Sequence, residues 1–370
     1  MTDLAPTSVT AHTPAAARMP TATTVRVMIC DDSAVIRGAL SRMLEADPEI
    51  TVVAKLENGK LAVDQIRAMQ VDVVVLDIEM PVMDGLTALP LLLRADPSVR
   101  VIMASTLTVR GAEIALRALR LGASDYVPKP STIGTVGDEG FRRELLEKVK
   151  GLARMRRRAA LPARVRPPIT FQVPPRTPAR LLAVGSSTGG PQALFTLVQG
   201  LGRSLAVPVV ITQHMPATFT PILADHLNRL GAMPCTEARD GESLVAGRIY
   251  LAPGDRHLLI EGGRGGLRAR LTTDPPENFC RPSVDPMLRS AAAACDGRVL
   301  VAMLTGMGQD GLAGTKKVIE AGGAAIGQDE ASSVVWGMPG AIAQAGLCTA
   351  VLPLPRIAPK LLEMLKGAHA

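Results

Sequence analysis

The sequence predicts an α/β protein of two successive domains, each built on a largely parallel sheet covered by helices. The chain has 370 residues, and at roughly 150 residues per domain this length indicates two domains with tails and a linker. In both halves, short aliphatic and β-branched runs alternate with helical stretches. Because these runs are apolar on both faces, we expect parallel strands buried between two helix layers.

The composition argues against several classes of protein. Aromatic residues make up only 2% of the chain, so nucleic-acid binding by base stacking is not expected. No apolar run approaches the roughly 18 residues of a membrane span, and residues 1–24 contain no signal-peptide core. We therefore expect a cytoplasmic protein without direct membrane insertion and without a nucleic-acid partner. Five scattered cysteines, without metal-type spacing, are expected to be reduced core thiols: Cys30, Cys235, Cys280, Cys295 and Cys348.

A basic, proline-rich segment separates the two halves. The formal net charge is +7, yet ten Lys or Arg and no acidic residue lie between Lys148 and Arg180, so the rest of the chain is slightly acidic. Such a segment is expected to be a linker with a solvated charge run, or a contact for an acidic partner. The expected organisation is a disordered extension over 1–24, a first domain over 25–147, this linker over 148–179 and a second domain over 180–370.

The first domain contains five βα units with polar residues at the strand ends. Its strands are expected at VRVMIC, TVVAKL, VDVVVL, VRVIMA and DYV. Reactive groups gather at the carboxyl ends of parallel strands, and those expected there are Asp31, Asp32, Asp77, Ser105 and Lys129. Each aspartate taken alone is better explained as a helix cap.

The three carboxylates together predict a different chemistry. Asp31, Asp32 and Asp77 would repel one another unless a hard divalent cation lay among them, and oxygen-only ligation suits Mg²⁺. Asp77 could then accept a phosphoryl group. The ammonium group of Lys129 would neutralise the incoming oxygens, and the hydroxyl of Ser105 would bond one of them.

Four segments of this half resemble the receiver domain of two-component response regulators: VMICDDSAVIR, VVVLDIEMPVMDG, VIMASTLT and GASDYVPKP. The resemblance implies a flavodoxin-like (βα)5 fold with Asp77 as the phosphorylation site. It also implies Mg²⁺ bound by Asp31, Asp32, Asp77 and the Glu79 carbonyl.

The same resemblance implies a receiver switch and a phosphodonor. The switch residues would be Ser105, Tyr126 and Lys129. The phosphodonor would be a histidine kinase.

The second domain opens with a strand, LLAVGS, that breaks into a helix through a glycine-rich turn. Later strands are expected at VPVVITQ and VLVAML, which predicts a doubly wound α/β domain with a mainly parallel sheet. Ser187 lies in this turn, within a G-x-S-x-G pattern and next to helix N–H groups that can bind negative charge. A catalytic serine, a phosphate-binding turn and a purely structural turn remain open at this point.

A catalytic serine needs a base and an orienting carboxylate. His214 ends a neighbouring strand and is the first candidate for the base, with His257 second. His226, within a helix, is expected to be a surface residue. Asp310 follows the VLVAML strand; its competing role is the N-cap of a helix from Gly311 to Glu320.

Five segments of this half resemble the protein-glutamate methylesterase of bacterial chemotaxis, whose family joins a receiver domain to the catalytic domain: AVGSSTGGPQAL, PVVITQHMP, YLAPGDRHLLI, RPSVDPML and VAMLTGMGQDG. The resemblance implies that Ser187 is the nucleophile, His214 the general base and then acid, and Asp310 the orienting carboxylate. The backbone N–H groups of Thr188 and Met307 are the candidates for the oxyanion hole.

The implied reaction is phosphorylation-activated hydrolysis of glutamate γ-methyl esters, with deamidation of particular glutamines, giving sensory adaptation. Its substrates would be methyl-accepting chemotaxis receptors. The esterase reaction is expected to need no cofactor, in contrast to the Mg²⁺ of the receiver.

Two other classes of protein compete with this interpretation. A phosphorylation-gated DNA-binding regulator would use the basic linker, but no helix-turn-helix is recognisable and the basic residues lie among prolines. A nucleotide-binding domain would use GSSTGG as a phosphate loop, but the sequence has neither GxxxxGK[ST] nor GxGxxG there.

Overall fold

The computed structural model describes residues 24–106, 108–129, 138–158, 170–173, 177–203, 205–231, 233–263 and 266–366. The expected N-terminal extension, except residue 24, and much of the expected linker lie outside the described residues. The extension is therefore not tested over most of its length, and the linker is tested only over 148–158, 170–173 and 177–179.

The first domain is a five-stranded parallel sheet in the order β2-β1-β3-β4-β5, as expected for a (βα)5 fold. Its strands are β1 Val25–Cys30, β2 Ile50–Leu56, β3 Val73–Asp77, β4 Arg100–Ser105 and β5 Asp125–Pro128. Its helices are α1 Ala34–Glu45, α2 Gly59–Met69, α3 Gly85–Ala95, α4 Val109–Arg120 and α5 Asp138–Arg158.

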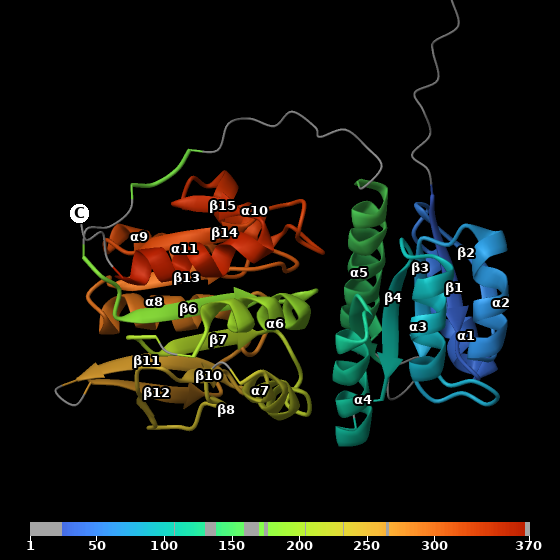
Figure 1. Cartoon of the computed structure of the whole chain (residues 1–370), viewed down its shortest axis with the longest axis horizontal. Coiled ribbons are helices and arrows are strands. Elements are labelled where there is room, and N and C mark those ends of the chain that lie inside the picture. The colour runs from blue at the N-terminus through green and yellow to red at the C-terminus, as the bar shows by residue number, and fades with distance from the viewer. Residues whose placement is uncertain are drawn as a thin grey trace, which may run out of the picture.

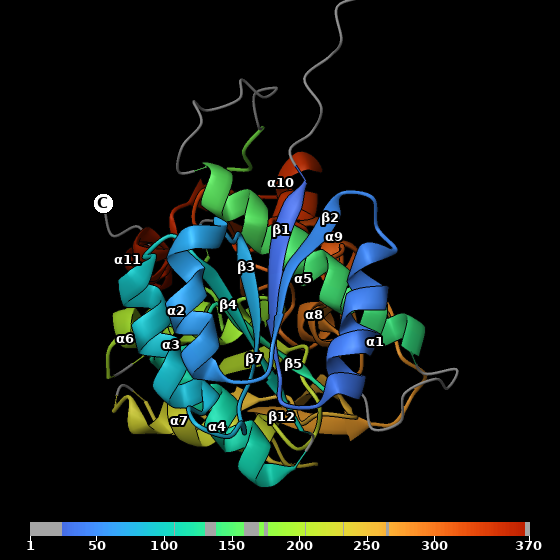
Figure 2. The ribbon, with the colours of Figure 1, turned by 90° about the vertical axis from the view of Figure 1, so that its right-hand side faces the viewer.

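Helices cover both faces of this sheet, with α1 and α5 on one side and α2, α3 and α4 on the other (Figure 2). Alternate residues of β1 explain the two layers. Val27 and Ile29 are buried with residues of α1 and α5, whereas Met28 packs with α2, α3 and α4. Strands buried on both faces need continuous apolar runs, which is why these strands were recognisable in the sequence.

Helix α5 runs eleven residues past the expected domain boundary, so the prediction that the linker begins at 148 is wrong. Several basic residues assigned to a solvated run are paired with carboxylates of the first domain. Lys150 lies 2.7 Å from Asp47, and Arg156 lies 3.0 Å from Asp96. The prolines that suggested a linker begin only at Pro162, and the residues up to Arg158 form the amphipathic helix α5.

The second domain is a seven-stranded parallel sheet in the order β15-β14-β13-β6-β7-β10-β8, with a separate three-stranded antiparallel sheet β11-β12-β9. The strands of the large sheet are β6 Leu181–Ser186, β7 Val209–Gln213, β8 Cys235–Glu237, β10 Ile249–Leu251, β13 Val299–Met303, β14 Ala324–Gln328 and β15 Ala350–Leu352. The small sheet consists of β9 Ser243–Leu244, β11 His257–Gly263 and β12 Gly266–Thr272.

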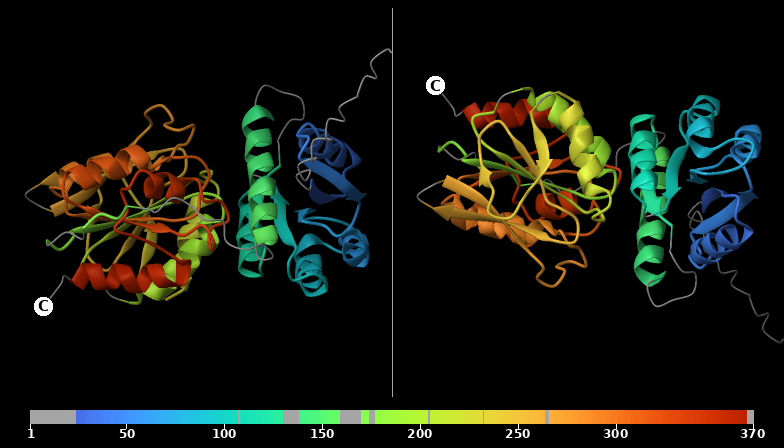
Figure 3. Two further views of the ribbon diagram at one scale, coloured as in Figure 1. Left: turned by 90° about the horizontal axis from the view of Figure 1, so that it is seen from above. Right: turned by 90° about the horizontal axis from the view of Figure 1, so that it is seen from below.

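Two helix layers enclose the large sheet, α6, α7 and α11 on one face and α8, α9 and α10 on the other (Figures 1 and 3). The helices are α6 Gly190–Leu201, α7 Thr220–Arg229, α8 Val284–Ala294, α9 Leu312–Glu320, α10 Met338–Gln344 and α11 Leu354–Lys366. In β6, Leu182 and Val184 pack toward α6, whereas Leu181 and Ala183 pack toward α8. Strands β13, β6 and β7 are adjacent, so their carboxyl ends open on one edge of the sheet.

Helices α4 and α5 face the second domain (Figures 1 and 3), and residues of β5 also contact it. Buried residues of α4, including Leu116 and Leu119, belong to the same hydrophobic cluster as Leu194 of α6 and Leu223 of α7. None of the helices in the described ranges is long and apolar enough to cross a bilayer.

The helical extension of α5 predicts a measurable stability effect. Leu152 is completely buried in the core of the first domain, so Leu152→Ala should lower the free energy of unfolding by about 2–5 kcal/mol. Arg154 is exposed on the same turn, and Arg154→Ala should change it by less than about 0.5 kcal/mol. Urea unfolding of both variants checks this, and equal effects would argue against the helix.

Candidate active site

The turn after β6 holds the Ser187 backbone in place. The N–H of Ser187 donates to the Thr305 carbonyl at 3.0 Å, and the side-chain amide of Gln213 donates to the Ser187 carbonyl at 2.9 Å. Gly189 has φ +73°, and a side chain on Gly190 would overlap the Gln213 amide. Only glycine satisfies both demands, which explains the glycine pair after the serine.

His214 follows β7 at the position level with Ser187, because β6 and β7 pair in parallel register up to the residue before each. The imidazole Nε2 lies 2.7 Å from Oδ2 of Asp310. The other ring nitrogen, Nδ1, lies 3.3 Å from Sγ of Cys280. Ser187 and His214 line the same cleft. Within the described part of the chain, the Ser187 hydroxyl makes no hydrogen bond, either to this imidazole or to another group.

Asp310 is almost completely buried, at 2% exposure, against the N-terminus of α8. Besides the imidazole, five groups donate to its carboxylate: Val284 N at 2.6 Å, Ser283 Oγ at 2.7 Å, Asn278 Nδ2 at 2.9 Å, Gly311 N at 2.9 Å and Asp285 N at 3.1 Å. These donors and the positive end of the α8 dipole offset the cost of burying the charge. Asp310 is not the N-cap of α9, because Gly311 holds that position and no side chain caps the helix.

The electrostatics of this pair favour an ionised carboxylate beside a basic imidazole. Burial alone would raise the pKa of Asp310, but hydrogen bonds from His214 and from the start of α8 outweigh it and hold this pKa below its ordinary value. Burial alone would lower the pKa of His214, but the hydrogen bond with Asp310 and the contact with Cys280 hold this pKa above its ordinary value. Each group stabilises the charged form of the other.

Several residues that sequence reasoning did not select complete this site. The amide of Asn278 donates to Asp310 and, at 3.0 Å, to Asp285. Burial, together with the nearby Asp310, raises the pKa of Asp285. Ser283 and Asp285 belong to the RPSVD segment quoted above, so their importance had a sequence signal.

The prediction for the cysteines is wrong at one position. Four of them are buried, as expected of core thiols, but Cys280 is partly exposed and lines the cleft. No spacing or composition signal distinguished this cysteine from the others.

The other two histidines considered for the base, His226 and His257, are buried and do not line the cleft. His226 is buried on α7, so its assignment to the surface is wrong; burial and the nearby Arg120 of α4 lower its pKa. His257 is buried away from the cleft, where its Nδ1 accepts from the Ser283 N–H at 3.2 Å. His214 is therefore the candidate base that meets the carboxylate.

A cleft of about 600 Å³ opens over these residues. Ser187, Thr188, His214, Met307 and Asp310 all line it. In the described part of the chain, the backbone N–H groups of Thr188 and Met307 donate to no protein acceptor. Both therefore stay candidates for the oxyanion hole.

The first domain forms the opposite wall of this cleft. Asp125 accepts a hydrogen bond of 3.2 Å from Gly189 N, so a carboxylate of one domain binds the start of α6 in the other. Lys148 of α5 is buried beside Asp125 at 3.6 Å. The Tyr126 ring stacks on Phe219 of the second domain with centroids 4.6 Å apart. The expected switch tyrosine therefore lies in the interface between the domains.

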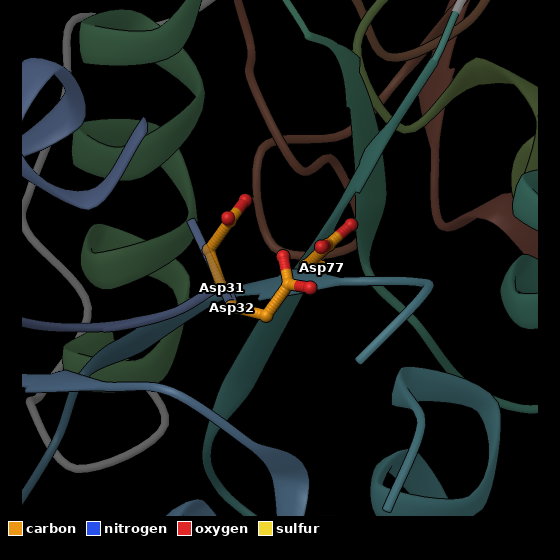
Figure 4. A group of neighbouring side chains, drawn as sticks. All are labelled: Asp31, Asp32 and Asp77. Atoms are coloured by element: carbon orange, nitrogen blue, oxygen red, sulfur yellow. The ribbon is translucent and has the colours of Figure 1, made fainter. Parts of the chain in front are cut away.

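At the carboxyl ends of β1 and β3, Asp31, Asp32 and Asp77 converge as expected (Figure 4). Each offers a carboxylate oxygen within 4.8 Å of the others. Lys129 Nζ lies 2.7 Å from Oδ1 of Asp77 and 2.8 Å from Oδ2 of Asp31. Burial, only partly offset by Lys129, raises the pKa of Asp77 to about 6. The all-oxygen donor set fits a hard divalent cation such as Mg²⁺.

Two further predicted residues lie beside this cluster. Ser105 ends β4 and is buried, and its hydroxyl donates to the Thr106 carbonyl at 3.1 Å. Glu79 and Asp32 line a common cleft beside α4.

Together, the fold and the two sites define a (βα)5 domain with a carboxylate cluster, joined to a parallel α/β domain with a serine, a histidine and an aspartate at one sheet edge. Residues 27–137 match the family model of the response regulator receiver domain, and residues 182–361 match that of the CheB methylesterase. The chain belongs to the family of protein-glutamate methylesterases/protein-glutamine glutaminases that carry a receiver domain. It is thus a hydrolase of this family.

Curated relatives of that name cover most of the chain. The protein-glutamate methylesterase/protein-glutamine glutaminase of group 2 operon from Rhodospirillum centenum is 53% identical over 90% of this chain and 92% of its own length. The Azospirillum brasilense relative is 54% identical over 90% of this chain and 91% of its own length. Among solved structures, the Thermotoga maritima CheB methylesterase catalytic domain is 37% identical, with a TM-score of 0.49, over 50% of this chain and 99% of that one.

The His214–Asp310 contact predicts a pKa that can be measured directly. Because the carboxylate stabilises the imidazolium, the pKa of His214 should lie above the ordinary value of about 6.5 and should fall by at least one unit in Asp310→Asn. NMR titration of the His214 ring in both proteins checks the sign. A pKa that rises or stays unchanged in the variant would contradict the interaction.

Proposed function

We propose that the cleft hydrolyses glutamate γ-methyl esters, and deamidates particular glutamines, on methyl-accepting chemotaxis receptors by a Ser-His-Asp mechanism. The observation that carries the proposal is the convergence of Ser187, His214 and Asp310 at the carboxyl ends of three adjacent strands. The names of the relatives support the substrate class. This activity would give sensory adaptation.

The first half of the reaction forms an acyl-enzyme. The hydroxyl of Ser187 attacks the γ-carbonyl carbon while His214 accepts its proton at Nδ1, since Nε2 faces Asp310. The N–H groups of Thr188 and Met307 stabilise the oxyanion that develops. His214 then returns the proton to the leaving oxygen, and methanol departs.

The second half regenerates the serine. Water attacks the acyl carbon, His214 accepts its proton, and the glutamate carboxylate leaves as Ser187 is reprotonated. Throughout, the low pKa of Asp310 keeps a negative charge beside the imidazolium that forms in both steps. A glutamine follows the same course with ammonia as the leaving group. No step calls for a cofactor.

Phosphorylation of Asp77 is proposed to control this activity. Asp31, Asp32, Asp77 and the Glu79 carbonyl would hold Mg²⁺, which when bound supplies charge that neutralises the phosphoryl oxygens. Lys129 is positioned beside the acceptor oxygen of Asp77. A chemotaxis histidine kinase is the proposed phosphodonor, and Ser105 the residue that responds to the phosphoryl group.

The receiver is proposed to restrain the esterase until it is phosphorylated. Residues from β5 and α5 line the catalytic cleft, including Tyr126, Arg143 and Lys148, and this placement supports a masked substrate path. Rearrangement at Ser105 and Tyr126 would loosen the Tyr126–Phe219 stack. An interface worth only about 1–2 kcal/mol suffices for a tenfold change in activity.

The catalytic assignment predicts large losses of activity. Ser187→Ala and His214→Ala should each lower methanol release from methylated receptor by about 10⁴-fold or more, and Asp310→Ala somewhat less, because the three act as a unit. Thr196→Ala, on the exposed side of α6, is the matched control and should keep wild-type turnover. More than a tenth of wild-type release in Ser187→Ala would sink the assignment.

The control assignment predicts a phosphate-dependent rise. A small phosphodonor with Mg²⁺ should add one base-labile phosphate and raise methanol release about tenfold. Asp77→Asn should remove both effects while keeping basal release, and chelation of Mg²⁺ should block the labelling. Phosphate found on serine or threonine, or a full activity rise in Asp77→Asn, would refute this control.

A further inference from the structure

The imidazole of His214 has two nitrogens, and both are in contact with other side chains. Nε2 meets Asp310 at 2.7 Å, and Nδ1 meets Sγ of Cys280 at 3.3 Å. A base that uses Nε2 to bind its orienting carboxylate has only Nδ1 left to accept the serine proton. In the described structure, the Ser187 hydroxyl is not bonded to that nitrogen. The thiol therefore occupies the position on the imidazole that the nucleophile needs.

Cys280 is held there by a short, tightly tied loop. Glu277 and Cys280 exchange two backbone hydrogen bonds of 3.2 and 2.9 Å, which close the loop at its base. Both residues between them have positive φ, +53° at Asn278 and +62° at Phe279. The carboxylate of Glu277 makes bidentate contacts of 2.6 and 2.9 Å with Arg289 of α8. The thiol thus has a defined place and is not a freely moving side chain.

The tip of this loop touches the receiver. The guanidinium of Arg143, on α5, lies 4.6 Å from the centroid of the Phe279 ring. Phe279 is otherwise exposed, at 84%, so in the described structure this cation–π contact is its link across the interface. One residue before it, Asn278 binds Asp310, and one residue after it, Cys280 meets His214. The loop consequently joins the receiver to two members of the proposed triad.

We propose that Cys280 is a positioning residue that holds the catalytic base in a resting state, its thiol competing with the Ser187 hydroxyl for Nδ1 of His214. Movement of Arg143 away from Phe279 frees the loop, and the vacated nitrogen then accepts the serine proton. This inference rests on the proposed function, because it takes Ser187 as the nucleophile and His214 as its base.

The test uses the full chain and a fluorophosphonate that labels an activated serine, so that no receptor is needed. Cys280→Ala and Cys280→Val lack a hydrogen-bonding group and should label about three- to tenfold faster than the unphosphorylated wild type. Cys280→Ser keeps such a group and should give a smaller rise. A packing role would not separate alanine and valine from serine in this way.

Several outcomes overturn the inference. Labelling of both Cys280→Ala and Cys280→Val at or below the wild-type rate, with thermal unfolding unchanged, would show that the thiol does not restrain the base. If one of these two variants fails to fold, the labelling rate of the other is compared with that of Cys280→Ser, and this comparison decides. Arg143→Gln should also raise labelling, but no further in a Cys280→Ala background; additive effects would break the link from the receiver to the thiol.

Ser187→Ala separates this inference from the proposed function. If it abolishes labelling and methanol release while the Cys280 variants show no rise, only the role of Cys280 fails. If it retains both activities, the proposed function itself fails.

Discussion

The buried carboxylate of Asp310 is the interaction on which the catalytic edge of the second domain depends. Six donors converge on its two oxygens, and they come from the imidazole, from the loop before α8, from the first residues of α8 and from the turn before α9. A buried charge without these partners would cost several kcal/mol. The carboxylate therefore fixes where α8 begins, how the loop around Asn278 lies and which way the His214 ring faces.

The same constraint explains why the site combines strand ends that are far apart in the sequence. Strands β13, β6 and β7 lie side by side, and the residues after each meet at one edge. Ser187 and His214 each directly follow a strand, and this sets their approximate places. The hydrogen bonds to Asp310 then set the orientation, which strand order alone does not specify.

The parallel sheets could be predicted because a strand buried on both faces leaves an unmistakable apolar run in the sequence. The polar residues that follow such runs, Asp77 and Ser187 among them, could be selected for the same reason. What could not be predicted depends on contacts across long sequence separations. The small sheet of β9, β11 and β12, the burial of His226 and the meeting of Cys280 with His214 have no local pattern. The start of α5 did have a local pattern. The basic residues and prolines that follow it were interpreted as a linker, although the helix continues through Leu152.

The interface between the domains includes two hydrogen bonds that water can replace. The side chain of Gln192, on α6, donates at 2.6 Å to the carbonyl of Leu119, in the last turn of α4, and Gly189 N donates to Asp125. Each domain thus caps a helix end of the other. When the domains part, the freed carbonyl and N–H at these helix ends become solvated and need no refolding of either domain. These two capping contacts therefore add little to the free energy of docking, which comes mainly from apolar contacts such as the stack of Tyr126 on Phe219.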